Sequence, residues 1–471
     1  MDRENHAIPL SRLRSRGATL LALAVAAGVL AYVCGFHSVR QVLAVSIFVL
    51  IVAATLLFWN FRLAIAFVGI TVLLAGNVIT IEQMVWSSEL SIILFLLGMM
   101  ILVGVLKDLG LFSWLIQLVI SMRRIDGGRF VCIVVILSAL LSCVVGEVTS
   151  TVIIMALVFQ VCDTLKVRPV PFLLISVLAT NIGSCGTMIG NPVGILIGSK
   201  AGLSFTDFLV WAFPVMLVAL VASLGLLTAW YRKEIRALSE RLAERRKMQL
   251  GLGPLVRIPY RRALGILVGV IVLISLHHPI EYLLGVEKNT ILMVTPLAAS
   301  GILMIWRHER ARHYVETEVE WWTLLFFMML FTVAGSLEHT GITEALAHRF
   351  QGVSGNQPGV LIPLVMVMAA LGSAFVDNIV FVSAFIPVVR ELQMTPLWWA
   401  MLFGACFGGN ITVIGSTANI VAVGMLEKRY RMKIGFLEWL IVGTVIGVLT
   451  CAIAWAALTI MAPHMPAFPS H

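Results

Sequence analysis

The chain has 471 residues, of which 60% are hydrophobic and 12% are charged. A soluble domain carries roughly 25% charged residues, so this composition excludes an ordinary soluble protein. The net charge of +9 does not indicate nucleic acid, because the basic residues cluster between the apolar runs, where the positive-inside rule places cytoplasmic loops. We therefore expect an integral protein of a bacterial-type inner (plasma) membrane, with no nucleic-acid partner.

The first half of the chain predicts membrane spans, one surface helix and one hairpin. The basic N-terminus is expected in the cytoplasm, and apolar runs of about 20 residues can cross a hydrocarbon core. The run 111–122 leads into Arg123 and Arg124, so it is expected to lie along the cytoplasmic interface. Residues 1–36 are interpreted as a tail with an extra first helix, and residues 37–230 as a first repeat. The expected elements are spans at 17–35, 41–59, 62–79 and 90–107, a re-entrant hairpin at 130–165, a broken span at 170–200 and a span at 209–230.

The second half, residues 263–461, is expected to repeat this order after a basic cytoplasmic loop at 231–262. The tail 462–471 is then external, and His471 lies outside. Threading both hairpins as ordinary pairs of spans is a second interpretation that polarity alone does not exclude. The expected elements are spans at 263–279, 289–306 and 321–338, an outer surface helix at 342–350, a re-entrant hairpin at 359–390, a broken span at 396–427 and a span at 439–461.

Three pairs of segments reveal an internal repeat, in the same order in both halves. Residues 94–110 align with 325–341, residues 186–190 with 411–415, and residues 204–209 with 435–440. An odd number of crossings in the first copy turns the second copy over, so the repeats are expected to be inverted. The sequence therefore predicts an all-α polytopic fold with two inverted-topology repeats, about 11 transmembrane helices, two re-entrant hairpins and broken helices at the midplane.

Four polar segments at membrane depth are candidate binding elements, namely the two hairpin tips and the two helix breaks. Glycine and proline unwind a helix there, and the freed backbone groups are tolerated in a membrane only where they line a protein cavity or a ligand. Freed carbonyls suit a cation, whereas helix N-termini suit an anion. The candidate residues are Glu147, Thr149, Ser150, Asn181, Gly183, Ser184, Thr187, Gly190, Asn191, Asp377, Asn378, Asn410, Thr412, Gly415, Ser416 and Asn419.

Glu147 and Asp377 are the only acidic residues that this threading places well inside the bilayer. Intramembrane carboxyl groups are costly and mark ion pathways. A Na⁺ ion is one candidate ligand, held by the oxygen-rich group Asp377, Asn378, Gly409 and Asn410. The seven cysteines are scattered and predict small buried residues without metal or disulfide chemistry. No nucleophile–base pair, phosphate-binding loop or redox motif is visible, so neither an enzyme nor a resident cofactor is expected.

These motifs resemble the ion transporter superfamily, in the branch of arsenite permeases, NhaD-type Na⁺/H⁺ antiporters and citrate-transporter-like permeases. The resemblance covers roughly residues 40–460. It implies a homodimer of elevator type, in which hairpins and broken helices form a transport domain that moves against a dimeric scaffold. Sodium-coupled dicarboxylate members carry Ser-Asn-Thr at both tips, whereas this chain carries Glu147-Val-Thr and Asp377-Asn-Ile. That departure counts against a dicarboxylate substrate. The motifs that carry the resemblance are 95–110, 147–150, 178–183, 188–192, 375–378, 408–410, 414–416 and 418–419.

The sequence thus favours a secondary active permease, coupled to Na⁺ or H⁺, that moves a small inorganic or carboxylate anion by alternating access. A Na⁺/H⁺ antiporter is the main alternative, because two buried acids without an intramembrane Lys or Arg suit cation exchange. Arsenite efflux is a third possibility. An ion channel is disfavoured, because matched hairpins and broken helices suit alternating access better than an open pore.

Overall fold

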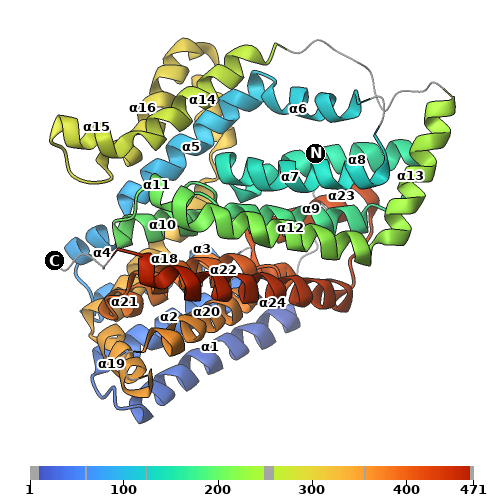
Figure 1. Cartoon of the computed structure of the whole chain (residues 1–471). Helices are drawn as coiled ribbons and strands as arrows, with labels where there is room; N and C mark the ends of the chain where they lie inside the picture. Colours follow the sequence, from blue (N-terminus) through green and yellow to red (C-terminus); the bar gives the residue numbers. More distant parts are fainter. Residues whose placement is uncertain (1–9, 59–60, 123–124, 249–258, 355–356, 467–471) are drawn as a thin grey trace. The chain divides into compact units, whose positions relative to one another are not determined.

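The computed structural model describes residues 10–58, 61–122, 125–248, 259–354 and 357–466, and within these ranges every regular element is a helix (Figure 1). The predicted all-α class is confirmed. Eight of the described helices are long and apolar enough to cross a membrane, or up to ten if each of two bent pairs forms one span. Three of the eight, Gly127–Val145, Glu147–Leu165 and Pro358–Phe375, are arms of the predicted hairpins, which the predicted eleven spans do not include. Four of the predicted spans are absent even from the ten, because each of the two broken spans consists of two short helices and because α2 (Val39–Leu57) and α3 (Arg62–Ala75) fall among the shorter apolar helices. The external tail at His471 lies outside the described residues.

The helices group into two compact units, each made of several chain segments. The first unit contains Met1–Leu90, Trp321–Val353 and Ser383–Leu392. Its helices are α1 (Leu10–Val33), α2 (Val39–Leu57), α3 (Arg62–Ala75), α4 (Ile81–Ser87), α18 (Trp321–His339), α19 (Ile342–Ser354) and the last part of α21 (Asn378–Glu391).

The second unit contains Ser91–Glu320, Ser354–Val382 and Gln393–His471. Helices α7, α9 and α12 lie side by side in it, as do α20, α22 and α24 (Figure 1). Both helix breaks, the first hairpin and the tip of the second hairpin belong to this unit. Its helices are α5 (Leu90–Asp108), α6 (Leu111–Ile120), α7 (Gly127–Val145), α8 (Glu147–Leu165), α9 (Val170–Ser184), α10 (Pro192–Ala201), α11 (Phe205–Asp207), a π-helix (Phe208–Ala212), α12 (Phe213–Trp230), α13 (Arg232–Lys247), α14 (Arg261–Ser275), α15 (His277–Leu284), α16 (Thr290–Trp306), α17 (Ala311–His313), a second π-helix (Tyr314–Glu318), α20 (Pro358–Phe375), the first part of α21, α22 (Thr395–Gly408), α23 (Thr417–Tyr430) and α24 (Phe436–Met461).

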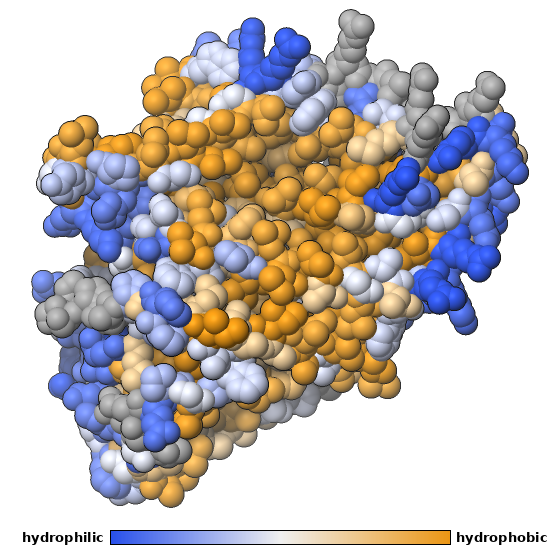
Figure 2. Space-filling model, viewed as in Figure 1, coloured by the Kyte–Doolittle hydropathy of each residue, from blue (hydrophilic) through white to orange (hydrophobic). Residues whose placement is uncertain are grey.

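The exposed side chains of α12 and α24 are apolar, as lipid contact requires. Val218 and Val221 of α12 and Ile441 and Val448 of α24 are each more than half exposed. Figure 2 shows hydrophobic side chains spread over much of the visible face and hydrophilic ones gathered where α13 lies. A face of this composition is stable against hydrocarbon and not against water, so the chain is a multi-pass membrane protein.

The basic segment 231–262, predicted as a cytoplasmic loop between spans, contains the helix α13, and its side of the membrane stays a prediction. Helix α13 buries Ile235, Leu238 and Leu242, whose spacing puts them on one face. Its Ser239 hydroxyl accepts a hydrogen bond from the backbone N–H of Gly127 at 2.9 Å, which ties α13 to the start of α7. The amphipathic pattern was not recognised in the sequence, because seven of the sixteen residues of α13 are Lys or Arg. Residues 249–258 of the same segment lie outside the described residues.

Two acidic residues at the ends of predicted spans form ion pairs with basic residues far away in the sequence. Asp108, at the end of α5, lies 2.5 Å from Arg310 and accepts a hydrogen bond from the Tyr314 hydroxyl at 2.8 Å. Glu338, near the end of α18, pairs with Arg390. Each carboxyl group therefore binds a distant cationic side chain and not the nearest helix end.

Candidate functional site

The two helix breaks have the same construction. Helix α9 ends at Ser184 and α10 begins after Asn191, whose side-chain oxygen accepts a hydrogen bond from the N–H of Gly194 at 2.7 Å. Helix α22 ends at Gly408 and α23 begins after Ser416, whose hydroxyl oxygen accepts one from the N–H of Ala418. Asn and Ser are preferred N-cap residues because they satisfy amides that a new helix leaves free. Both second half-helices therefore start at a polar cap.

Each break is held against the first arm of the hairpin from the same half of the chain. The Thr187 hydroxyl donates to the carbonyl oxygen of Cys143 in α7. The Thr412 hydroxyl donates to the carbonyl oxygen of Ala374 in α20, which is the equivalent bond in the second half. Two equivalent bonds of this kind show that the internal repeat seen in the sequence is also a repeat of structure.

Glycine allows both broken helices to approach their hairpins closely. A Cβ atom on Gly183 would lie 2.3 Å from the Cα atom of Ala139, and one on Gly408 would lie 2.3 Å from the carbonyl oxygen of Ala370. Such distances are too short for non-bonded atoms, and the obstacle is backbone that cannot rotate away. Both glycines are therefore required for packing, whatever their backbone groups bind.

We predict that Gly183→Ala lowers the free energy of unfolding by about 3 kcal/mol, because the added methyl group must push α7 and α9 apart. Gly225→Ala in α12 is the matched control, since a Cβ atom there meets nothing within 4 Å. Thermal unfolding of the purified protein in detergent measures both. Equal melting temperatures for the two variants would show that the close approach of α7 and α9 is not required.

The two breaks are joined by side chains that cross from one half of the chain to the other. The Ser416 hydroxyl donates to Asn181 Oδ1 at 3.1 Å, and the Nδ2 atom of Asn191 donates to the Cys406 sulfur at 3.0 Å. Asn181 Nδ2 also donates to the Oδ1 atoms of Asn410 and Asn419, both at 2.8 Å. All of these side chains are almost completely buried. The result is one enclosed polar cluster.

Both hairpin tips reach this cluster. Gly146 forms the first tip with a φ of +87°, a conformation that glycine adopts readily. The carboxyl group of Glu147, which follows, is 4% exposed and interacts with Ser184, Asn378 and Ser416. Its Oε2 atom is buried and has no hydrogen-bond partner among the described residues.

Asp377 at the second tip has a different environment. Its carboxylate accepts hydrogen bonds from the Thr417 hydroxyl at 2.7 Å and from the backbone N–H of Ile379 at 3.1 Å. It also lies close enough to Glu147 for the two charges to interact. Asp377 is thus bonded to both α21 and α23, whereas Glu147 retains a free oxygen.

Four helices begin at this cluster, namely α8, α10, α21 and α23. Each helix N-terminus carries a partial positive charge and unpaired amides. They oppose the negative charge of Glu147 and Asp377, the two acids at the cluster. The groups that act on Glu147 are Asp377, Ser184, Asn378 and Ser416, none of which is cationic. The site can therefore hold an anion at the helix ends, a cation at the carboxyl groups, or both.

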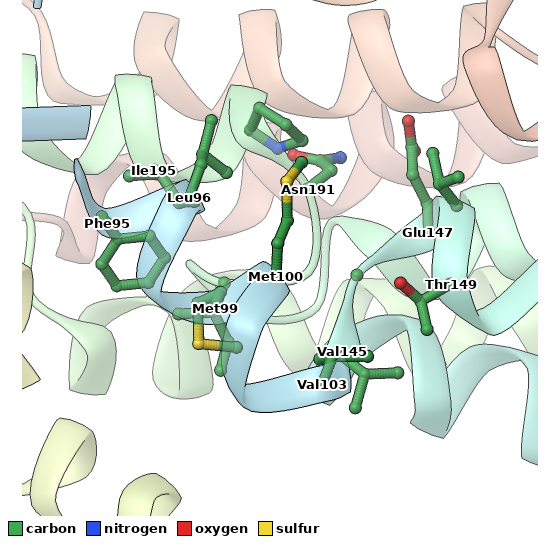
Figure 3. A pocket seen from close by; sticks show the side chains of 14 residues that line it. Phe95, Leu96, Met99, Met100, Val103, Val145, Glu147, Thr149, Asn191 and Ile195 are labelled. Atoms are coloured by element: carbon green, nitrogen blue, oxygen red, sulfur yellow. The ribbon is translucent and has the colours of Figure 1, made fainter. Parts of the chain in front are cut away.

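A cavity of about 100 Å³ opens beside Glu147. In Figure 3 the apolar side chains of α5, including Phe95 and Met99, line one side, and the hairpin tip lines the other. Thr149 and Asn191 contribute polar groups to the lining, and the Glu147 carboxyl group points away from Thr149. The volume suffices for several water molecules or a small solute.

Most of the residues predicted from the sequence meet at this cluster. The group brought together consists of Glu147, Asn181, Ser184, Asn191, Asp377, Asn378, Asn410, Ser416 and Asn419.

The other predicted residues lie at the edge of the cluster or contribute to the packing and hydrogen bonding of the backbone around it. The Ser150 hydroxyl donates within its own hairpin, to the carbonyl oxygen of Ser138 at 3.0 Å. Gly190 and Gly415 let their loops pass close to the ends of α9 and α22, where a Cβ atom would meet a backbone oxygen.

The proposed Na⁺ ligands are only partly assembled. The carbonyl oxygen of Gly409 accepts a hydrogen bond from Asn419 Nδ2, and that of Asn410 accepts one from Trp439 Nε1. Each carbonyl keeps a second lone pair that a cation can use. No cluster of three or more His, Cys, Asp or Glu side chains suited to a metal ion occurs in the part of the chain that the structure describes. The Na⁺ site stays a prediction.

Two residues of the cluster were missed by the sequence reasoning. Thr417 binds Asp377, and Cys406 accepts from Asn191. Cys406 is buried, as predicted, and its sulfur atom also accepts a hydrogen bond, which was not predicted. Cys406 occupies the position in α22 that Asn181 occupies in α9, so aligning the two repeats could have identified it as a candidate residue.

The family model for citrate transporters matches residues 15–404. The chain belongs to this family. An uncharacterized transporter of Mycobacterium tuberculosis strain H37Rv is 32% identical over 431 residues, which cover 88% of this chain and 97% of that one. The human P protein is 27% identical over 444 residues, covering 78% of this chain and 52% of the relative.

A solved structure shares the fold of this citrate transporter family member. The YdaH transporter of Alcanivorax borkumensis matches with a TM-score of 0.55 over 90% of this chain and 98% of that chain. The sequence identity is 16%, so the likeness shows the fold alone. The predicted membership of the ion transporter superfamily is confirmed, and the protein is a transporter.

Proposed function

We propose that this transporter is a secondary active permease, coupled to Na⁺ or H⁺, that moves a small inorganic or carboxylate anion by alternating access. The observation that carries the proposal is the meeting of four helix N-termini with two buried carboxyl groups in one cluster. An anion alone would be repelled by Glu147 and Asp377. A cation or proton that neutralises these groups removes the repulsion, which couples the binding of the two ions.

The family supplies the first anion to test. Citrate is a carboxylate, and the matching family model is that of citrate transporters. Both hairpin tips differ from the Ser-Asn-Thr motif of the dicarboxylate members, which argues against the same dicarboxylate mechanism in this chain. Inorganic anions therefore belong in the same panel. A homodimer, as the resemblance implies, is part of the proposal.

Exchange of Na⁺ for H⁺ is a second candidate function. It is favoured by one observation, the proximity of Glu147 and Asp377 in one cluster, with no Lys or Arg among the groups that act on Glu147. Two acids that cannot both remain charged and unpaired are suited to hold a proton and a cation in turn.

Proteoliposomes loaded with defined gradients test these candidates. We expect saturable uptake of one anion among citrate, sulfate and arsenite that requires an inward Na⁺ or H⁺ gradient. Liposomes without protein are the control. Na⁺-driven proton movement without any anion would favour the antiporter, and flux that neither saturates nor needs a gradient would indicate a channel.

A further inference from the structure

The first hairpin, formed by α7 and α8, holds three buried hydroxyl groups without hydrogen-bond partners. Ser138 and Ser142 are one helical turn apart on α7, and Thr151 is one turn beyond Glu147 on α8. All three side chains are fully buried, and their hydroxyl oxygens have no partner among the described residues. The bond from the Ser150 hydroxyl to the Ser138 carbonyl shows that the two arms face each other at this level.

The second hairpin has no such interior. The equivalent positions are Ala369, Ser373 and Val382, and the Ser373 hydroxyl is already bonded to the carbonyl oxygen of Ala405 at 2.7 Å. The ring of Phe381 lies against Gly372, where a Cβ atom would be only 2.1 Å from the ring. The second hairpin is therefore filled by an aromatic side chain, and the free hydroxyl groups are particular to the first.

Buried polar groups are nearly always bonded to protein or to ordered water, because an unmet hydroxyl group is destabilising. A buried water molecule typically makes about three hydrogen bonds to groups of this kind. The free Oε2 atom of Glu147 is one turn from Thr151 and needs a partner too. We propose that the first hairpin binds ordered water between its arms, held by Ser138, Ser142 and Thr151 and directed at Glu147.

This water site would not reach the far end of the hairpin. The buried residues in the next turns of both arms are apolar, among them Val131, Val134, Ile154 and Val158. The water is thus an enclosed solvation site and not a channel. If the proposed proton coupling holds, the water solvates the carboxyl group of Glu147, with which Asp377 at the second hairpin tip interacts.

Infrared difference spectroscopy on the purified full chain can detect such water directly. The difference between the spectra in acid and in alkaline buffer is recorded in ordinary and in ¹⁸O-labelled water for wild type, Thr151→Val and Ser142→Ala. Thr164→Val is the matched control, because the same isosteric change on α8 removes a hydroxyl group that is already bonded to the Gln160 carbonyl oxygen. We expect an isotope-sensitive O–H band in wild type and Thr164→Val that is lost in Thr151→Val and weakened in Ser142→Ala.

Transport assays then separate this inference from the proposed function. The pH profile of transport is measured for wild type, Thr151→Val and Glu147→Gln. An unaltered pH profile in Glu147→Gln would refute the proton-coupling role of Glu147. The isotope-sensitive infrared band would then remain as the test of the water site. Absence of the band in wild type, an equal band in all variants, or a changed Na⁺ requirement in Thr151→Val would each overturn the water site.

Discussion

Glu147→Gln is expected to abolish the pH dependence of transport while substrate still binds. Glutamine has the size and neutral charge of a protonated glutamate, so the variant is fixed in the proton-bound state. Burial disfavours the charged form of Glu147, whereas a bound cation and the helix N-termini favour it. In wild type, titration of one such group can change the transport rate by up to about tenfold per pH unit on one side of the midpoint. The transport rate of Glu147→Gln should vary by no more than about twofold over the same pH range.

Uptake by proteoliposomes at a series of pH values measures this difference, with substrate binding determined separately. Glu240→Gln, on the exposed side of α13, is the control for the same chemical change away from the site. If Glu147 is permanently protonated and only bonds across the cluster, Glu147→Gln will keep the wild-type profile. The proton-coupling role would then be withdrawn.

The order of elements was readable from the sequence because glycine and proline mark the breaks in both halves. Gly186 to Pro192 and Gly408 to Ser416 interrupt apolar runs at equivalent points, and the structure has a broken helix at each. A repeat gives every signal twice, so a weak local pattern became a strong one.

Hydrogen-bond partners could not be predicted, because they depend on contacts between distant segments. Thr187 was expected to offer its hydroxyl to a ligand, yet that hydroxyl donates to the Cys143 carbonyl in another helix. Conversely, His277 was not among the candidate residues, yet it begins α15 and is fully buried. Sequence patterns report which residues are polar at membrane depth, and packing decides which of them remain free for a ligand.

Asp377→Asn is expected to raise the cation concentration for half-maximal transport at least about tenfold, the usual loss when a group that supports an ion site is removed. The change deletes one negative charge from the cluster and keeps the size of the side chain. Asparagine Oδ1 can still accept from the Ile379 N–H, and its amide can donate to the Thr417 hydroxyl. The second hairpin tip should therefore stay folded, and the loss should be electrostatic.

Thr417→Val separates charge from hydrogen bonding at the same carboxylate. It removes the hydroxyl group that donates to Asp377 Oδ2 at 2.7 Å but leaves the negative charge in place. We expect Thr417→Val to retain ion-dependent uptake with a modest change in apparent affinity, because hard cations bind the carboxylate oxygens themselves. Uptake against Na⁺ concentration at fixed pH, and against pH at fixed Na⁺, gives both affinities for each variant. Wild-type ion dependence in Asp377→Asn would exclude Asp377 as the cation ligand and leave Glu147 as the only acid of the cluster able to couple transport to an ion.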